Sequence, residues 1–488
     1  MSPHDLVAFF NMKLMACLIA LATLVFLVPT QQATSQSLAF THVTVIDMTG
    51  APPKQDMTVI VKGDRIESIQ KTERKLPRAI QVIDASGKFL IPGLWDMHVH
   101  FTETERTFSM FIANGVTGVR NMGGDLDDLL RWRNDVASGK LPGPQIVMCG
   151  PIIDGPQPAA HGPTLVVSSP IEGRRAVDML KSRNADCVKV YDRLPRDAYF
   201  AIIDEAKKLN IPVVGHVPLA ITSVEASEAG QKSIEHLGSF LESASTLEDE
   251  LLKAERSNEP VTDPSDFPKR IAARGETMLN TYDETRAQKI FATFIKNKTW
   301  QVPTLEFKWA QTFLDDITQQ GDPRLKFIPA SEQQWWTPKK NFFARYRTPE
   351  YIVFRKHMFQ KEMDLVGAMH KAGVPFMTGT DLSGAYVFAG FSLHHELELF
   401  VQAGFTPMEA LQAATLNPAL FLNEQDKRGT VEPGKIADLV LLDANPLDDI
   451  RNTQKINGVV LSGRYLSRLT LDKMLSDVAE SANKENTK

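Results

Sequence analysis

Short apolar stretches separated by turn residues lie near both ends of the chain and predict β-strands. Between Leu38 and Ile91 they are HVTVID, DMTVIVKGDRIESI and AIQVIDASGKFLIPG. The same pattern returns in KIADLVLLDANP and INGVVLSGRYL. We therefore expect a small β-sandwich domain built from residues 36–92 and 425–468, with a larger domain inserted between its two halves.

The region between these halves alternates short apolar segments with helical patterns such as DAYFAIIDEAKKLN and EMDLVGAMHKAG. The apolar segments are GLWDMHVH (93–100), GVTGVRNMG (115–123), PQIVMCG (144–150), CVKVYD (187–192), IPVVGHV (211–217), SIEHLG (233–238), TWQVPTL (299–305) and VPFMTGTD (374–381). This alternation is typical of parallel βα units. Eight such units predict an α/β fold, a (β/α)8 TIM-like barrel over residues 93–424, with the active site at the carboxyl ends of its strands.

Two long inserts, near 241–298 and 306–365, interrupt the barrel pattern after predicted strands, so both should rise over the catalytic face. The second insert contains an aromatic group that could form a lid over a substrate or the buried face of an added helix pair: Trp335, Trp336, Phe342, Phe343 and Tyr346. The tail at 469–488 is polar, and we expect it to be frayed or helical on the surface.

The N-terminal segment has the composition of a secretory signal peptide. Lys13 precedes the apolar run LMACLIALATLVFLV, and the small residues Ala33-Thr34-Ser35 follow it. A membrane-spanning helix needs roughly 20 apolar residues, more than this run supplies. We expect residues 1–35 to be removed and the protein to be exported, periplasmic or secreted, without membrane association unless this segment is retained as an anchor.

Length and composition are those of a globular enzyme. The chain has 488 residues, of which 43% are apolar and 23% charged, enough to bury a large core. The formal net charge of −5 includes no basic excess that could neutralise nucleic-acid phosphates. We expect a small-molecule substrate and no nucleic-acid partner, and a homo-oligomer remains an option.

Cleavage of the signal peptide would leave two cysteines, Cys149 and Cys187. This is too few for a disulfide framework in a chain of this size. The two residues fall on neighbouring predicted strands, Cys187 two positions before Lys189. We expect both to be free thiols.

Three residues at predicted strand positions suggest metal chemistry. His98 and His100 are spaced two apart, which places both imidazoles on one face of a strand, although such pairs also occur on strand surfaces. Lys189 stands between valines, where a buried ammonium would be costly to desolvate. Its amine could add carbon dioxide and become a carbamate with two ligand oxygens, or the side chain could reach solvent from the strand end.

Three further residues end other predicted strands: His216 in VVGHV, His236 in SIEHLG and Asp381 in TGTD. Each could be a structural polar residue by itself. Ligand-type side chains at five of eight strand ends together predict a metal site, because barrel enzymes hold their catalytic groups there. Asp381 would act as metal ligand and as proton acceptor.

Taken together, these motifs resemble the amidohydrolase superfamily, in particular its imidazolonepropionase-like and prolidase-like branch. The matching elements also include AGFTPMEALQAATLNPA and GTVEPGKIADLVLLDANP, so the resemblance covers nearly all of the chain after the signal segment. It implies two divalent metal ions, one on His98, His100 and Asp381 and one on His216 and His236. Carbamylated Lys189 would bridge them. Zinc suits these ligands, and manganese, cobalt or iron fit as well.

The resemblance implies a metal-dependent hydrolase that directs activated water at an amide carbonyl, with Asp381 as general base and then general acid. Its substrate would be a dipeptide or an N-acyl amino acid. A lactonase, a cyclic-amide hydrolase or an organophosphate-ester hydrolase could use the same site, and a non-catalytic barrel binding protein is the alternative outside enzymes.

The substrate-binding residues are the least transferable part of the resemblance. His161 could contact the substrate or be a plain loop histidine. Arg120 and Tyr191 could bind a substrate carboxylate or carbonyl, or they could make structural hydrogen bonds. Arg120-Asn121 stands where relatives often have Arg-Asp, and the insert before the seventh strand is unusually long. The pair His394-His395 we expect to be exposed or to cap a helix.

Overall fold

A computed structural model describes residues 37–72, 76, 80–257, 266–341, 344, 346–382 and 384–485. The signal-peptide prediction for residues 1–35 lies outside this part of the chain, as do Phe342 and Phe343. None of the helices in the described ranges combines the length and the apolar character needed to cross a membrane.

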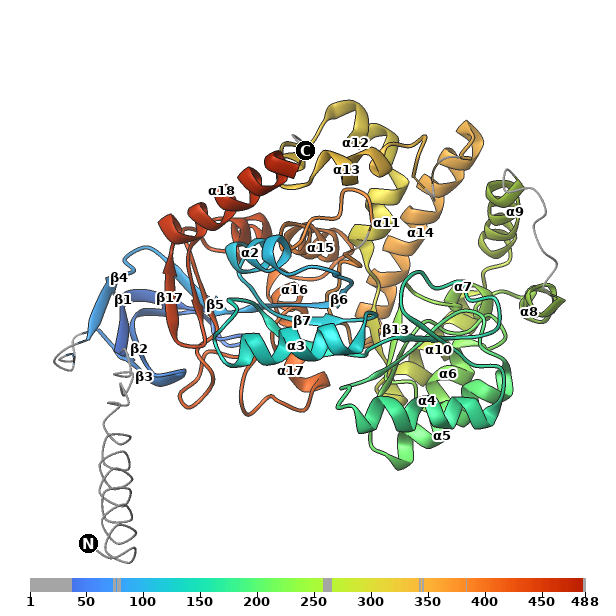
Figure 1. Cartoon of the computed structure of the whole chain (residues 1–488), viewed down its shortest axis with the longest axis horizontal. Coiled ribbons are helices and arrows are strands. Elements are labelled where there is room, and N and C mark those ends of the chain that lie inside the picture. The colour runs from blue at the N-terminus through green and yellow to red at the C-terminus, as the bar shows by residue number, and fades with distance from the viewer. Residues whose placement is uncertain are drawn as a thin grey trace, which may run out of the picture.

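A mixed sheet of eight strands combines both ends of the described chain (Figure 1). Its strands are β1 (Ser37–Val45), β2 (Lys54–Lys62), β3 (Arg65–Lys71), β4 (Gln81–Asp84), β5 (Phe89–Pro92), β15 (Leu439–Leu442), β16 (Ile456–Leu461) and β17 (Arg464–Ser467). Strand β15 pairs antiparallel with β5 and thereby joins the two ends. Where a sandwich was expected, hydrogen bonds connect all eight strands in one sheet that forks at β1, because β4 and β5 pair with successive parts of that strand.

The segment between these ends has a TIM-barrel-like arrangement of parallel strands. One sheet holds β6 (Leu94–Val99), β7 (Val116–Asn121) and β8 (Gln145–Met148). The other runs in the order β10-β9-β11-β12-β13-β14 and holds β9 (Ile152–Asp154), β10 (Thr164–Val166), β11 (Val188–Val190), β12 (Val213–Gly215), β13 (Ser233–Glu235) and β14 (Trp300–Val302).

Backbone hydrogen bonds link the edges of these two sheets. Asp186 N donates to Met148 O at 2.8 Å, beside β11 and β8. On the other side the segment 375–382 lies between β14 and β6, since Met377 N donates to Gln301 O at 3.0 Å and Asp381 N donates to His98 O at 2.7 Å. The eighth predicted segment is thus a neighbour of the first, but it forms isolated bridges to Gln301 and Val99 where a strand was predicted.

Amphipathic helices follow the strands: α2 (Glu105–Ala113), α3 (Leu126–Ala137), α4 (Pro170–Ser182), α5 (Arg196–Lys208), α6 (Ser223–Ala229), α15 (Phe391–Gln402), α16 (Pro407–Ala413) and α17 (Leu416–Phe421). In α5, Ala198, Ile202 and Ala206 recur every four residues and are buried on one face. Thr222 begins α6 with a capping box, and Gly230 ends it with φ of 99°, a left-handed conformation that glycine adopts without strain.

The inserts are helical. The first forms α7 (Phe240–Ser243), α8 (Glu248–Ser257), α9 (Phe267–Asn280) and α10 (Glu284–Asn297), and the second forms α11 (Leu305–Thr312), α12 (Leu314–Gln320), η2 (Pro323–Phe327), α13 (Ala330–Gln333), η3 (Gln334–Trp336) and α14 (Pro349–Ala372). Trp336 is buried against Tyr386 and Phe388, whereas Trp335 and Tyr346 are exposed. Trp335, Trp336 and Tyr346 therefore do not form one continuous aromatic surface.

The C-terminal tail is better packed than its polar sequence suggests. Residues Arg468–Glu485 form α18, which lies along α2 (Figure 1). Leu471, Val478 and Ala482 are buried, and they recur at spacings that face one side of a helix. The tail is thus a part of the packed structure where a frayed or surface segment was one expectation.

Cys149 and Cys187 form a disulfide, so the expectation of free thiols was wrong. Both side chains point into the interior of the strand cluster, where they pack with Trp95, Met97 and Val302. Their Cα atoms are 4.5 Å apart, within disulfide range, because β8 and β11 lie side by side at this level. That lateral distance depends on strand order, which the spacing of the cysteines does not specify.

Removal of this disulfide should destabilise the fold. The bond closes a loop with a sequence separation of 38, which corresponds to on the order of 3–4 kcal/mol of unfolding free energy in the chain-entropy model. We expect Cys149→Ala/Cys187→Ala to lower the denaturant midpoint, with reduced wild-type protein as the comparison. Alkylation of both cysteines in unreduced, denatured protein would contradict the disulfide.

Candidate metal centre

The end of β6 and the segment 375–382 bring three ligand-type side chains together. The Nε2 atoms of His98 and His100 each lie 3.5 Å from Asp381 Oδ1. One ligand atom from each residue falls within 4.8 Å of the others. Two imidazoles and a carboxylate at this separation form a donor set for a divalent ion.

Two more histidines extend this group. His216 follows β12, and His236 follows β13. The ring of His236 lies 4.7 Å from that of His98 and 4.8 Å from that of His216, measured between centroids. His236 Nδ1 is 3.9 Å from Asp381 Oδ2. All five predicted histidine and aspartate residues are therefore neighbours in one cluster.

The backbone at two of these residues is unusual. His236 has φ of 60° and Asp381 has φ of 55°, in the left-handed region that non-glycine residues rarely adopt. Such conformations cost about 1–3 kcal/mol each and concentrate at functional sites. His236 takes this conformation directly after β13, and Asp381 takes it in the segment 375–382, at the points where their side chains enter the cluster.

Lys189 points into the same space from the middle of β11. Its side chain is fully buried, and Nζ has no hydrogen-bond partner among the described residues. Burial lowers the pKa of this amine to about 8, against the opposing charges of Glu235 and Asp381. Gly215 leaves room for the side chain, because a Cβ there would lie 2.7 Å from Lys189 Cδ.

A buried carboxylate orients His98. Glu235 Oε2 accepts from His98 Nδ1 at 2.9 Å, so the ring proton is on Nδ1 and Nε2 faces the cluster. Glu235 Oε1 accepts from Ser233 and, at 3.0 Å, from Arg120. Burial and neighbouring cations hold the pKa of His98 well below its ordinary value, and the ring is neutral.

Arg120 makes the structural hydrogen bonds that were the alternative to contact with substrate. Its guanidinium is fully buried and donates to Met97 O, Ser233 Oγ and Glu235. Those contacts hold Glu235 in place and use three of the five N–H donors of the guanidinium. The next residue, Asn121, stands where relatives often have an aspartate.

The other histidines have similar outer partners. His216 Nδ1 donates to Asp192 Oδ1 at 2.7 Å. His236 Nδ1 donates to Thr304 Oγ1 at 2.6 Å, and that hydroxyl in turn donates to Pro303 O. Asp192, Glu235 and Thr304 were missed from the sequence, although Asp192 and Glu235 lie in the same short motifs as candidate ligands.

Two buried carboxyl groups have raised pKa values. Burial raises the pKa of Asp381 to about 6, with Lys189 and Lys308 acting in the opposite direction. Burial also raises the pKa of Asp96 to about 7. Asp96 accepts from Thr380 Oγ1 at 2.6 Å and so connects β6 to the segment that carries Asp381.

The remaining candidates lie around this cluster. Tyr191 stacks on His216, with ring centroids 3.9 Å apart. His161 is exposed in the loop between β9 and β10. Substrate contact stays a prediction for both. His394 is buried between Thr453 and Asn114 O, so it is neither exposed nor a cap.

His395 also departs from the expectation of an exposed or capping residue. Its ring donates to Glu306, which is fully buried. Burial opposes a charge on the ring, but this carboxylate raises the pKa of His395 above its ordinary value. The pair connects α15 to α11.

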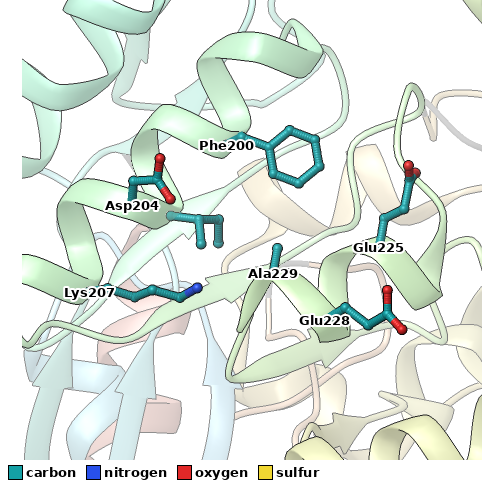
Figure 2. Close-up of a pocket in the computed structure, with 7 residues that line it drawn as sticks. Phe200, Asp204, Lys207, Glu225, Glu228 and Ala229 are labelled. Atoms are coloured by element: carbon teal, nitrogen blue, oxygen red, sulfur yellow. The ribbon is translucent and has the colours of Figure 1, made fainter.

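A surface groove of about 340 Å³ lies elsewhere, between α5 and α6 (Figure 2). Phe200, Asp204, Lys207, Glu228 and Ala229 line it, with Glu225 at one end. Glu225 is already engaged by Arg196 and by the cap of α6. The groove contains none of the clustered histidines and is separate from the candidate metal centre.

Comparison with known proteins assigns the family. The profile of the amidohydrolase family matches residues 89–466. The chain belongs to the amidohydrolase family. As an amidohydrolase it is a hydrolase that acts on carbon–nitrogen bonds of amides. The matched residues include all the parallel strands from β6 to β14 and the pairing of β5 with β15 in the mixed sheet.

The individual proteins that this chain resembles share less than a quarter of its residues. Ochratoxinase from Aspergillus niger is 24% identical over 435 residues, covering 76% of this chain and 73% of its own length. Among solved structures, a bottromycin amidohydrolase superposes with a TM-score of 0.70 at 22% identity, covering 91% of this amidohydrolase and 90% of that chain. A Xaa-Pro dipeptidase superposes with a TM-score of 0.63 at 21% identity, covering 88% and 100%. These structural likenesses support the fold.

The support that Glu235 gives to His98 can be tested directly. We expect Glu235→Gln to lower the affinity for divalent metal about 10- to 100-fold, because His98 loses a charged partner. Arg120 would also lose its counter-charge, which costs about 3–5 kcal/mol of stability in a buried pair. Glu228→Gln on the surface groove is the control. Chelator competition and thermal unfolding measure both effects, and wild-type affinity in the Glu235 variant would contradict the assignment.

Proposed function

We propose that this protein is a binuclear, metal-dependent amidohydrolase that cleaves a dipeptide or an N-acyl amino acid. The observation that carries the proposal is the convergence of His98, His100, His216, His236, Lys189 and Asp381 in one buried cluster. We also propose that residues 93–424 close into a complete (β/α)8 barrel around it, with residues 36–92 and 425–468 as the second domain.

The donor set supports a divalent metal. His98 Nε2 and Lys189 Nζ are buried polar atoms without a hydrogen-bond partner among the described residues, an arrangement that costs free energy unless a ligand satisfies it. His98, His100 and Asp381 would hold one ion, and His216 and His236 the other. Lys189, carbamylated by carbon dioxide, would bridge them. We propose zinc because imidazole and carboxylate ligands suit it.

The chemistry divides between the bound metals and the protein. Divalent ions held at this site would lower the pKa of a water molecule and polarise the substrate carbonyl. Asp381 takes the proton from water and delivers it to the leaving nitrogen. A carboxyl whose pKa burial raises to about 6 suits this exchange near neutral pH. Glu235, Asp192 and Thr304 keep the imidazoles in the required orientation.

The choice of substrate rests on the similar proteins. Two of them carry names that denote hydrolases, a Xaa-Pro dipeptidase and a bottromycin amidohydrolase. Their likeness to this chain supports an amide with amino-acid character on at least one side. We further propose that residues 1–35 are a cleaved signal peptide, so that the reaction takes place outside the cytoplasm.

A substrate panel tests the proposal. Purified protein reconstituted with zinc and bicarbonate is assayed against dipeptides, N-acetyl amino acids and, for comparison, lactones. We expect turnover of the dipeptide or N-acetyl compounds, and loss of at least 10³-fold in kcat for Asp381→Asn because the proton carrier is removed. Turnover of lactones alone would contradict the amide assignment.

The metal bridge has its own test. We expect wild-type protein to bind close to two zinc equivalents, and Lys189→Ala to bind less metal and lose activity. Added acetate or bicarbonate should partly restore the variant, because a small carboxylate can supply the two oxygens of the carbamate. Lys207→Ala on the surface groove is the control. Full zinc content and normal turnover in the Lys189 variant would exclude the bridge.

A further inference from the structure

A row of polar side chains leads away from the metal centre along α11. Thr304, which precedes this helix, accepts from the ring of His236 at 2.6 Å. Lys308 and Gln311 follow at spacings of four and three residues, so all three lie on one side of the helix. Each helical turn rises about 5.4 Å, which places Lys308 one turn from the ligand cluster.

The contacts of this row place it in the wall of the site. The ring of Phe307 lies 6.5 Å from that of His236. Gly384 follows Asp381 by three residues, and a Cβ there would lie 2.7 Å from the Phe307 ring and 3.3 Å from Gln311 Nε2. The polar side of α11 thus borders the loop that begins at Asp381.

Lys308 brings a positive charge to this wall. Its ammonium donates to Glu362 Oε1 at 2.7 Å, and the two side chains are 13% and 9% exposed. Glu362 belongs to α14, which packs beside α11 (Figure 1). An ammonium has three N–H donors, and this is the one hydrogen bond that the ammonium of Lys308 makes among the described residues. Two donors are left for another acceptor.

Gln311, on the same side of α11 as Lys308, has side-chain atoms that could bind a ligand. Its side-chain Nε2 and Oε1 are both buried without a hydrogen-bond partner in the described part of the chain, and the residue is 8% exposed. The second oxygen of Glu362 is in the same condition. Buried amide and carboxylate atoms are nearly always paired in proteins, so unpaired ones beside a catalytic cluster indicate a ligand site.

We propose that Lys308 and Gln311 bind the free carboxylate of the substrate, with Glu362 as the positioning residue that holds the ammonium. The carboxylate would accept from Lys308 Nζ and from Gln311 Nε2. This inference rests on the proposed function and makes it narrower: the enzyme acts on amides whose amino-acid part ends in a free carboxylate, and it discriminates against the same compounds with a carboxamide end.

The experiment compares matched substrates on the metal-loaded enzyme. An N-acetyl amino acid and its carboxamide are assayed with wild type and with Lys308→Met. We expect the variant to raise KM for the carboxylate about 10- to 100-fold, the effect of losing a charge-assisted hydrogen bond, with little change in kcat. Neither parameter should change for the carboxamide. Gln311→Leu should produce a smaller change of the same kind.

Two further variants separate recognition from folding. Lys308→Met/Glu362→Met removes both charges together, so no unpaired carboxylate remains buried, and it should show the same loss for the carboxylate. Lys356→Met removes a more exposed lysine that pairs with Asp316, and it should leave KM unchanged for both substrates. An equal loss for both substrates, or an unchanged KM in the Lys308 variants, would overturn the proposal.

Binding measured by calorimetry keeps this test separate from the proposed reaction. Failure of wild type to hydrolyse either compound would count against the proposed function. The carboxylate site would still be supported by tighter binding of the N-acetyl amino acid than of its carboxamide, provided that Lys308→Met removes the difference. Equal binding of the two compounds to wild type would overturn the carboxylate site itself.

Discussion

The candidate metal centre depends on one buried carboxylate, that of Glu235. It accepts from His98 with one oxygen and from Arg120 with the other, and all three side chains are fully buried. A buried guanidinium without a counter-charge would be strongly unfavourable. Arg120 is therefore paired with Glu235 beside the cluster. The same carboxylate accepts from His98 Nδ1, so that Nε2 of His98 faces the candidate ligand site.

The same logic extends to the other ligands. His216 and His236 each have Nδ1 hydrogen-bonded to an oxygen from another part of the chain, Asp192 for His216 and Thr304 for His236. Strand ends supply the positions, and these outer contacts supply the orientation. The positive φ of His236 and Asp381 indicates that the backbone accepts strain to complete the arrangement.

We propose that the second insert adds substrate selectivity to the candidate metal centre. Helix α11 begins directly after Thr304, the residue that orients His236, and its first turns carry Lys308 and Gln311. Helix α14 contributes Glu362 across the helix pair. The parallel strands thus position the groups that we propose take part in the reaction, while a segment added after β14 carries the groups that we propose select the substrate. The two parts are joined at Thr304.

The sequence by itself determined the local part of this protein. A spacing of two residues put His98 and His100 on one side of the chain, and alternating strands and helices predicted the parallel units and the strand ends at which His216 and His236 lie. Those features depend on bond geometry and on amphipathic periodicity within a few residues.

Tertiary structure decided the rest. Whether Cys149 meets Cys187, whether Arg120 faces a substrate or Glu235, and whether α18 packs on α2 all depend on which strands and helices become neighbours. His98 and Glu235 are 137 positions apart in the chain, but His98 Nδ1 and Glu235 Oε2 are hydrogen-bonded at 2.9 Å. Side chains at such separations meet only through strand order and register, which residue spacing does not encode.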